Sequence, residues 1–258
     1  MALELGLCSV TFRKLDYANV LELATSARVR GIEWGADIHV PAGDAERAKA
    51  VKAESAACGI TVASYGSYVE AGVTSNEAFA DVLATASALG APNIRIWAGR
   101  RGIASTDVTA RDRAKCVAAL RAFAFAAAKA SVTLSLEFHR ETLTDSLDST
   151  LRLLDETADP NVFTYWQPAY WQPERNNTAA AIAELEALRP RLSHLHIFNW
   201  GPERERLPLQ AAETFWQPVL DRVCAWNDSS RYAFLEFVRE DDPAAFIEDA
   251  ATLRNWLE

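Results

Sequence analysis

Residues 135–141 read SLEFHRE, and residues 234–240 read FLEFVRE. Each stretch places a glutamate, Glu137 or Glu236, late in a short run of residues that favour β-strands. The near repetition predicts two equivalent strands that carry a carboxylate at the same depth. In a closed parallel barrel a charged strand residue lies inside or at the mouth, and catalytic groups collect at the carboxyl ends of the strands.

Short strand-like runs alternate with Ala-rich helical stretches along the rest of the chain. Strands are expected over Leu5–Thr11, Gly31–Trp34, Thr61–Tyr65, Asn93–Trp97, Val132–Phe138, Val162–Trp166, Leu192–Phe198 and Tyr232–Val238. Helices are expected over Tyr17–Val29, Ala45–Ala57, Asn76–Leu89, Arg111–Ala130, Leu147–Glu156, Thr178–Leu188, Ala212–Cys224 and Pro243–Leu257. The expected helix caps are Asp16, Ser75, Asp145 and Asp242. This alternation predicts a (β/α)8 barrel that forms one domain over residues 1–258.

An open doubly wound sheet is the competing architecture. Such a sheet usually carries a Gly-rich phosphate loop after its first strand, and residues 7–13 (LCSVTFR) contain no glycine. The length of 258 residues is close to the roughly 250 that a (β/α)8 barrel typically needs. The barrel is therefore the better interpretation.

Charge and cysteine content limit the partners. The net charge is −9, with 26 basic against 35 acidic residues, which disfavours nucleic acid as a partner. The longest uncharged run, Ser55–Val69, is too short and too polar to cross a bilayer, so no membrane partner is expected. Met1–Val10 lacks the basic start of a signal peptide. The cysteines show no paired spacing, which favours reduced thiols and a cytoplasmic location; they are Cys8, Cys58, Cys116 and Cys224.

Further polar residues stand at strand ends. His139 shares a face with Glu137, and His194 and His196 share a face in SHLHIFNW (193–200). The sixth strand ends in YWQPAYWQP (165–173), where Gln167 follows the strand directly.

Two interpretations of these residues compete. A lone histidine or glutamate inside a strand is more often a paired core residue, and we expect Glu33 and Arg95 to form such an interior ion pair. Two unpaired carboxylates at one barrel mouth would repel each other, and a divalent cation would neutralise them. One divalent metal, Mn, Mg, Co or Zn, is therefore expected at Glu137, Gln167, His196 and Glu236.

At these residues the sequence resembles the xylose-isomerase-like barrel superfamily, the sugar phosphate isomerases and epimerases related to endonuclease IV. The motifs that carry the resemblance are GIEWG (31–35), NIRIWAG (93–99), LEFHRE (136–141), HLHIF (194–198) and LEFV (235–238). Their order and spacing match that family over essentially the whole chain. The endonuclease branch is the least similar, because its trinuclear zinc site needs more ligands than four histidines readily supply.

The resemblance implies that Glu137, Gln167, His196 and Glu236 hold the metal. The chain departs from the family at the sixth strand, with Gln167 where the family has Asp and Tyr170 where it often has His. A glutamine carbonyl can coordinate but brings no charge, so metal affinity or preference should differ. The substrate contact of the missing histidine is also in doubt.

The expected function is that of a metal-dependent sugar isomerase or epimerase. Proton transfer beside a carbonyl would pass through an enediolate, and the resemblance to ketose 3-epimerases implies that Glu137 and Glu236 act as acid and base. A metal-dependent lyase that dehydrates a polyol or keto-inositol is one alternative, and a non-catalytic sugar-binding barrel is another. The sugar or polyol is expected to contact Trp97, His139, Arg140, Glu141, Tyr170 and His194.

Two further expectations concern a phosphate on the substrate and the oligomeric state. Arg100 and Arg101 form the local basic cluster after the fourth strand, and we interpret them as a solvated loop, so a phosphorylated substrate lacks support. Eight tryptophans, several on expected helices or loops, are compatible with a homodimer.

Overall fold

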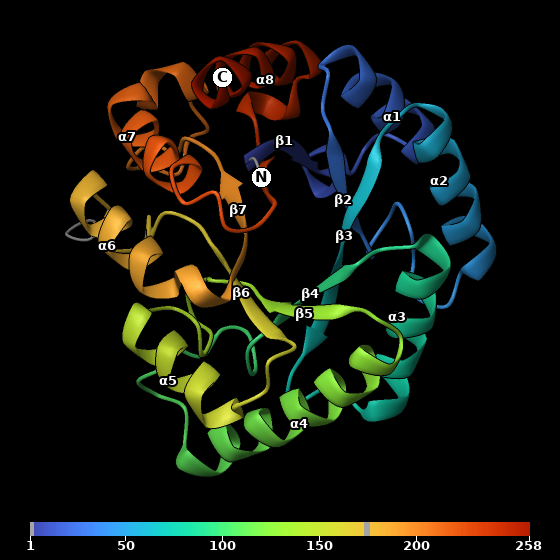
Figure 1. The fold of residues 1–258 in the computed structure, drawn as a ribbon, viewed down its shortest axis with the longest axis vertical. Coiled ribbons are helices and arrows are strands. Elements are labelled where there is room, and N and C mark those ends of the chain that lie inside the picture. Colours follow the sequence, from blue (N-terminus) through green and yellow to red (C-terminus); the bar gives the residue numbers. More distant parts are fainter. Residues whose placement is uncertain (1–2, 173–175) are drawn as a thin grey trace.

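Eight parallel strands form a closed ring with a helix outside after each of them (Figure 1). This computed structural model describes residues 3–172 and 176–258; Met1, Ala2 and 173–175, part of the domain expected over 1–258, lie outside the described residues. The strands are β1 (Leu3–Cys8), β2 (Gly31–Gly35), β3 (Thr61–Glu70), β4 (Asn93–Trp97), β5 (Thr133–Leu136), β6 (Val162–Trp166), β7 (Leu192–Ile197) and β8 (Arg231–Leu235).

The helices cover the outer face of this ring. They are α1 (Tyr17–Ser26), α2 (Ala45–Ala57), α3 (Asn76–Leu89), α4 (Ala110–Lys129), α5 (Leu147–Thr157), α6 (Thr178–Leu188), α7 (Glu213–Cys224) and α8 (Pro243–Leu257). None of the helices among the described residues is long and apolar enough to cross a membrane.

The pairing of the first and last strands closes the barrel. Leu3 pairs with Arg231 and Leu7 with Leu235, in parallel register. Both faces of such a sheet are covered, so the strands carry apolar residues almost continuously, and Leu7, Ile32 and Leu195 are fully buried. The predicted single (β/α)8 barrel is confirmed.

Several strands end at other residues than predicted, because hydrogen bonding to the neighbouring strand stops earlier or continues further along the backbone. β5 ends at Leu136 and β8 at Leu235, so Glu137 and Glu236 are each the first residue after a strand. β3 continues to Glu70, because its pairing with β4 resumes after an irregularity at Glu70↔Trp97. Apolar composition alone does not mark these points, since buried residues continue past each strand end.

Helix caps follow the prediction with one correction. The side chains of Asp16, Ser75 and Asp242 accept backbone N–H groups at the starts of α1, α3 and α8. The expected cap Asp145 is wrong, because Ser146 caps α5. The Asp145 carboxylate instead accepts the N–H of Ser105 at 2.8 Å and ties the loop after β4 to the loop after β5.

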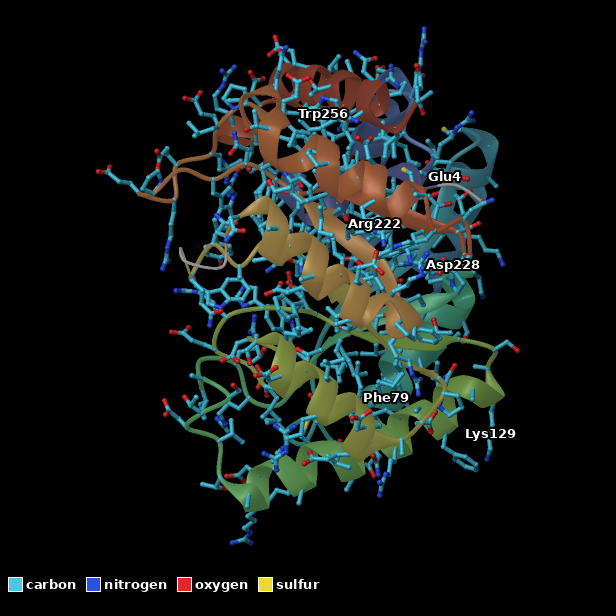
Figure 2. All side chains as sticks on the ribbon, turned by 60° about the vertical axis from the view of Figure 1, so that its left-hand side comes forward. Glu4, Phe79, Lys129, Arg222, Asp228 and Trp256 are labelled. Carbon is cyan, nitrogen blue, oxygen red and sulfur yellow. The ribbon has the colours of Figure 1, made fainter. Side chains whose placement is uncertain are left out.

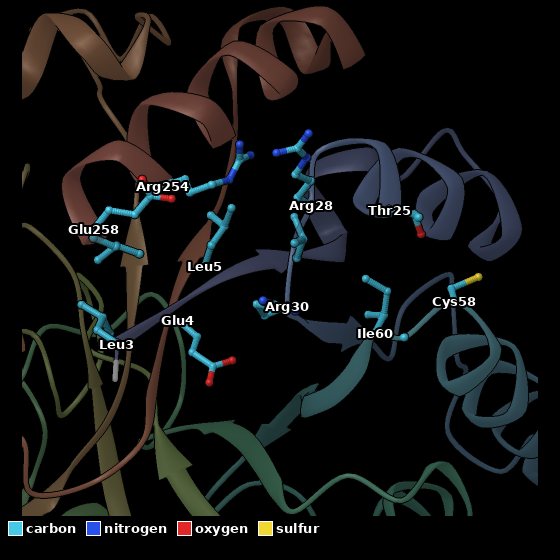
Figure 3. Close-up of a pocket in the computed structure, with 13 residues that line it drawn as sticks. Leu3, Glu4, Leu5, Thr25, Arg28, Arg30, Cys58, Ile60, Arg254 and Glu258 are labelled. Carbon is cyan, nitrogen blue, oxygen red and sulfur yellow. The ribbon is translucent and has the colours of Figure 1, made fainter. Parts of the chain in front are cut away.

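The two ends of the barrel differ in character. Glu4, Asp228 and Lys129 lie on one side of the molecule in Figure 2, the end at which the strands begin. A hollow of about 550 Å³ also lies there, between Leu3, Arg28, Ile60 and Arg254 (Figure 3). Barrel enzymes place their chemistry at the opposite, carboxyl end of the strands, so the cavity that Glu137 and Glu236 line at that end is the relevant one.

Candidate active site

Glu137 and Glu236 occupy equivalent positions after β5 and β8. The N–H of Glu137 donates to the carbonyl of Ile96 on the preceding strand at 3.0 Å, and that of Glu236 donates to Ile197 at 3.0 Å. Both side chains are buried, at 4% and 5% exposure. The same backbone bond therefore sets both carboxylates at one depth, as the repeated sequence predicts.

Both carboxylates reach a cavity of about 130 Å³ at the mouth of the barrel. Its floor is polar, and its walls are largely aromatic. The lining residues are Val10, Arg13, Tyr68, Arg95, Trp97, Arg101, Glu137, His139, Gln167, Tyr170, Phe198, Trp200, Glu236 and Phe237.

Arg95 forms the centre of a buried ion-pair network below this cavity. Its Nε lies 2.7 Å from Oε1 of Glu33, which confirms the predicted pair. Its Nη1 also bonds Glu137, so the expectation that Glu137 is unpaired is wrong. The sequence identifies inward-facing residues, but the reach of a guanidinium across two strands depends on the packing. Although burial opposes ionisation, Arg95 holds the pKa of Glu33 well below its usual range.

Glu33 also accepts the phenolic O–H of Tyr165 at 2.6 Å. That hydroxyl lies 2.8 Å from Ser64, and Asn93 donates to the same serine at 2.9 Å. This chain of hydrogen bonds crosses the barrel interior, so the floor of the cavity rests on satisfied polar groups.

His196, Glu236 and Cys8 form a second buried cluster. Nδ1 of His196 lies 3.2 Å from Oε2 of Glu236, and Cys8 Sγ lies 3.8 Å from Oε1 of Glu236. Neither ring nitrogen of the fully buried His196 makes a well-directed hydrogen bond with any residue in 3–172 or 176–258. An imidazole, a carboxylate and a thiol whose ligand atoms lie within 4.8 Å of one another suit a transition metal such as zinc or cobalt.

Without a cation, the thiol of Cys8 is protonated. Burial raises its pKa, and the neighbouring carboxylates Glu33 and Glu236 raise it further. Cys8 points into the barrel from the end of β1 and is fully buried. The sequence alone predicts only that Cys8 is a small residue of the core.

The cavity brings together six of the predicted site residues: Trp97, Glu137, His139, Gln167, Tyr170 and Glu236. His196 lies behind Glu236 and does not line the cavity. Arg140 and Glu141 line a neighbouring hollow beside Trp171.

His194 lies deeper in the barrel, where its Nδ1 accepts the N–H of Tyr232 at 3.1 Å. Burial lowers the pKa of His194 to about 3, so its ring is neutral. The sequence predicts His194, Arg140 and Glu141 as substrate contacts, but none of the three lines this cavity.

His139 has a defined tautomer in the cavity wall. Its Nδ1 lies 2.8 Å from the carbonyl oxygen of Arg140, so Nδ1 carries the hydrogen. In the neutral ring, Nε2 is then an acceptor. The ring packs edge-on against Trp97, with centroids 4.8 Å apart.

Arg13, Arg101 and Phe237 are lining residues that the sequence did not single out as substrate contacts. Arg13 follows β1 within LCSVTFR and could have been found as the charged residue nearest the end of that strand. Phe237 carries no such signal.

Fold and site together define a (β/α)8 barrel with acidic, imidazole and thiol groups at its carboxyl mouth. Residues 21–254 match the family described as xylose isomerase-like TIM barrel, and the chain belongs to that family.

Two matches from Bacillus anthracis, one in sequence and one in structure, illustrate the similarity. A 3-dehydroshikimate dehydratase is 33% identical over 107 residues, which cover 41% of this chain and only 36% of that protein. The crystal structure of the probable 3-DHS dehydratase AsbF superposes with a TM-score of 0.83 at 19% identity, covering 98% of this chain and 99% of that chain.

An epimerase shares the fold as well. D-psicose 3-epimerase of Clostridium cellulolyticum H10, solved with D-tagatose, gives a TM-score of 0.76 at 17% identity, covering 99% of this chain and 100% of that chain. At this identity the structural likeness establishes the fold.

Proposed function

We propose that this protein is a divalent-metal-dependent isomerase or epimerase of a small polyhydroxylated carbonyl compound. The observation that carries the proposal is the placement of Glu137 and Glu236, two buried carboxylates at equal depth directly after β5 and β8 that both line one cavity. Groups on different sides of a bound substrate can remove a proton from one face and return one to the other, which inverts a carbon centre.

The metal would be held by Glu137, Gln167, His196 and Glu236. Support comes from the fully buried ring of His196, whose nitrogens make no well-directed hydrogen bond within the described residues, and from the Glu236 carboxylate, 3.2 Å from its Nδ1 in the buried cluster with Cys8. When bound, a divalent cation supplies positive charge that stabilises the developing negative charge of an enediolate.

In the proposed reaction, separate residues transfer the proton, position the two glutamates, contact the substrate and exclude water. One of Glu137 and Glu236 removes the proton beside the carbonyl, and the other returns one. Arg95 holds Glu137 in place through a direct ion pair, and the ring of His196 lies against Glu236, with Nδ1 3.2 Å from Oε2. In the neutral ring of His139, Nε2 accepts a hydrogen bond from a substrate hydroxyl, because the hydrogen on Nδ1 is donated to the backbone carbonyl of Arg140. The aromatic walls of the cavity exclude water from the reacting carbon.

Dehydration is the second candidate reaction. The 33% identical segment of a 3-dehydroshikimate dehydratase favours it, and abstraction of a proton beside a carbonyl is a step that dehydration shares. The two reactions differ in their products, because only dehydration changes the mass of the substrate.

Metal content and solvent-proton exchange test the proposal together. The protein is purified without chelator, its metals are measured by elemental analysis, and ketoses and polyols are incubated with it in deuterated water. We expect near-stoichiometric divalent metal, loss of that metal in His196→Ala, and deuterium on the carbon beside the carbonyl of a turned-over substrate.

A deuterated product of unchanged skeleton supports isomerisation or epimerisation, whereas a dehydrated product supports the second candidate. Absence of metal after soaking and dialysis would contradict both and favour a sugar-binding barrel without turnover.

A further inference from the structure

Two residues that line the cavity, Trp97 and Arg101, carry hydrogen-bond donors in their side chains. Arg101, in the loop after β4, lies over the ring of Trp97, with its guanidinium carbon 4.9 Å from the ring centroid. The same guanidinium lies 5.6 Å from the ring of Tyr68. Both aromatic residues and Arg101 line the cavity, so the arginine interpreted from sequence as a solvated loop residue belongs to the site.

The bonding of Arg101 leaves one edge of its guanidinium open. Its Nε donates to Oε1 of Glu70 at 3.2 Å, and no residue in 3–172 or 176–258 accepts a hydrogen bond from Nη1 or Nη2. The side chain is 45% exposed, yet Glu70 and the two aromatic rings restrict it. An arginine held in this way loses less conformational entropy when it binds a planar anion with both Nη groups.

Arg13 provides the contrast within the same cavity. Its Nε donates to Asp37 at 2.6 Å, its Nη2 to the hydroxyl of Tyr68 at 2.7 Å, and its Nη1 to the carbonyl of Val10 at 3.2 Å. All three nitrogens of Arg13 are therefore engaged, and its role is to fix the loop after β1.

Trp97, over whose ring Arg101 lies, also carries a donor without an acceptor in the described part of the chain. Nε1 of Trp97 is buried and has no hydrogen-bond partner among the described residues, and Trp97 itself is only 7% exposed. Buried polar groups are normally bonded, so an orphaned indole N–H in a cavity wall indicates a ligand acceptor. Arginine and indole both donate and neither accepts.

We propose that Arg101 and Trp97 bind a carboxylate of the substrate, which makes the substrate of this site a small polyhydroxylated acid. This inference rests on the proposed function and names its substrate class. A carboxylate matches a guanidinium fork in planarity and in single charge, and it only accepts hydrogen bonds. A neutral hydroxymethyl group could not form an ion pair with the guanidinium of Arg101.

The charges in the lining of the cavity argue against a phosphorylated sugar, whose phosphate is a dianion. The other arginines in the lining, Arg13 and Arg95, are bonded to Asp37, Glu33 and Glu137, which leaves one open guanidinium edge among the described lining residues for a dianion.

Matched ligands that differ only at the terminal carbon test the assignment. Binding to the purified holoprotein is measured by calorimetry for D-glucuronate, D-glucose and D-glucose 6-phosphate, for D-galacturonate and D-galactose, and for D-gluconate and sorbitol. We expect at least one acid to bind more tightly than its neutral partner and its phosphate. Arg101→Gln should weaken that acid about 10- to 100-fold, the range of a charge-assisted hydrogen bond, and leave the neutral partner unchanged.

Arg100→Gln is the matched control, because Arg100 is the preceding exposed arginine and lines a different hollow. Arg101→Lys keeps the charge but loses the fork, so it should restore only part of the affinity. Equal affinity for acids and neutral partners, equal losses in Arg100→Gln and Arg101→Gln, or no binding of any acid would overturn the carboxylate assignment. Retained metal and proton exchange in that case would leave the proposed function standing, whereas their absence would contradict both.

Discussion

At the scale of single residues, Arg95 matters most for stability, because it is one buried cation between two buried carboxylates. Replacing it with methionine leaves Glu33 and Glu137 without their partner at almost no solvent exposure. We expect Arg95→Met to lower the free energy of unfolding by about 3–5 kcal/mol, measured by urea denaturation.

The exposed pair Lys49–Glu46 is the control for this prediction, with side chains 63% and 87% exposed. Lys49→Gln should change stability by less than about 1 kcal/mol, because solvent screens such pairs. Equal effects of the two substitutions would show that the interior network adds nothing beyond surface electrostatics.

The two glutamates at the mouth should respond alike to loss of charge. Glu137→Gln and Glu236→Gln keep the side-chain shape but remove the carboxylate that is the proposed acid or base, so each should reduce turnover by about 10²- to 10⁴-fold. Glu240, an exposed residue on the loop after β8, serves as control, and Glu240→Gln should keep its activity. A glutamine variant of either mouth residue with full turnover would remove that residue from the mechanism.

What the sequence could predict at this scale is the face of each residue. The period of two placed Glu137, His139 and Glu236 toward the interior, and the cavity contains all three. The period does not tell how far a side chain reaches, so the second bond of Arg95 and the approach of Cys8 to Glu236 required the structure.

At the scale of elements, α1 provides a direct test of helix capping. The Asp16 carboxylate accepts the N–H of Asn19 at 2.8 Å. Asp16→Ala should destabilise the protein by about 1 kcal/mol, whereas Asp16→Asn, which keeps the acceptor, should cost far less. Thermal unfolding of both variants measures the difference, and equal losses would mean that the negative charge stabilises the helix and the cap bond does not.

Helices were easier to predict than strand ends for a physical reason. Caps and apolar periodicity mark helix boundaries, and four of the eight expected helices, those of α2, α3, α6 and α8, begin and end at the observed residues. A strand stops where a neighbour ceases to pair with it, which depends on residues far away in sequence. β5 and β8 accordingly end earlier than predicted, and β3 ends later.

At the scale of the whole molecule, pH should act through His39. This buried ring joins two loops, with Nδ1 2.9 Å from the hydroxyl of Ser9 and Nε2 3.1 Å from the carbonyl of Leu15. Burial lowers the pKa of His39 below its ordinary value, and the neighbouring Asp37 only partly opposes this. The unfolded chain therefore takes up a proton first as the pH falls.

The neutral ring contributes its full stability above the unfolded pKa of about 6.5, and this contribution decreases as the pH falls below that value. We expect the melting temperature of the wild type to fall more steeply between about pH 7 and pH 5 than that of His39→Asn, whose side chain does not titrate. Parallel curves would assign the acid sensitivity to other groups.

The barrel as a whole was predictable because alternation of strand and helix leaves few topologies. Eight repeats close a parallel sheet, and the pairing of β1 with β8 follows from that closure. The contents of the mouth were less predictable, because loops after different strands converge there from distant parts of the chain. Arg101 reaches the cavity by stacking on Trp97 and Tyr68, a contact that no spacing in the sequence announces.

The position of Arg101 has a consequence for how such a barrel can diversify. Glu137 and Glu236 are fixed by backbone bonds to neighbouring strands, whereas Arg101 belongs to a connecting loop whose hold on the site is a pair of ring contacts and one bond to Glu70. Exchange of that loop alters what enters the mouth while the strand-borne groups keep their geometry. If the two glutamates react with the substrate and Arg101 selects it, as proposed, the two tasks belong to separate segments of the chain, and one segment can change in evolution while the other is retained.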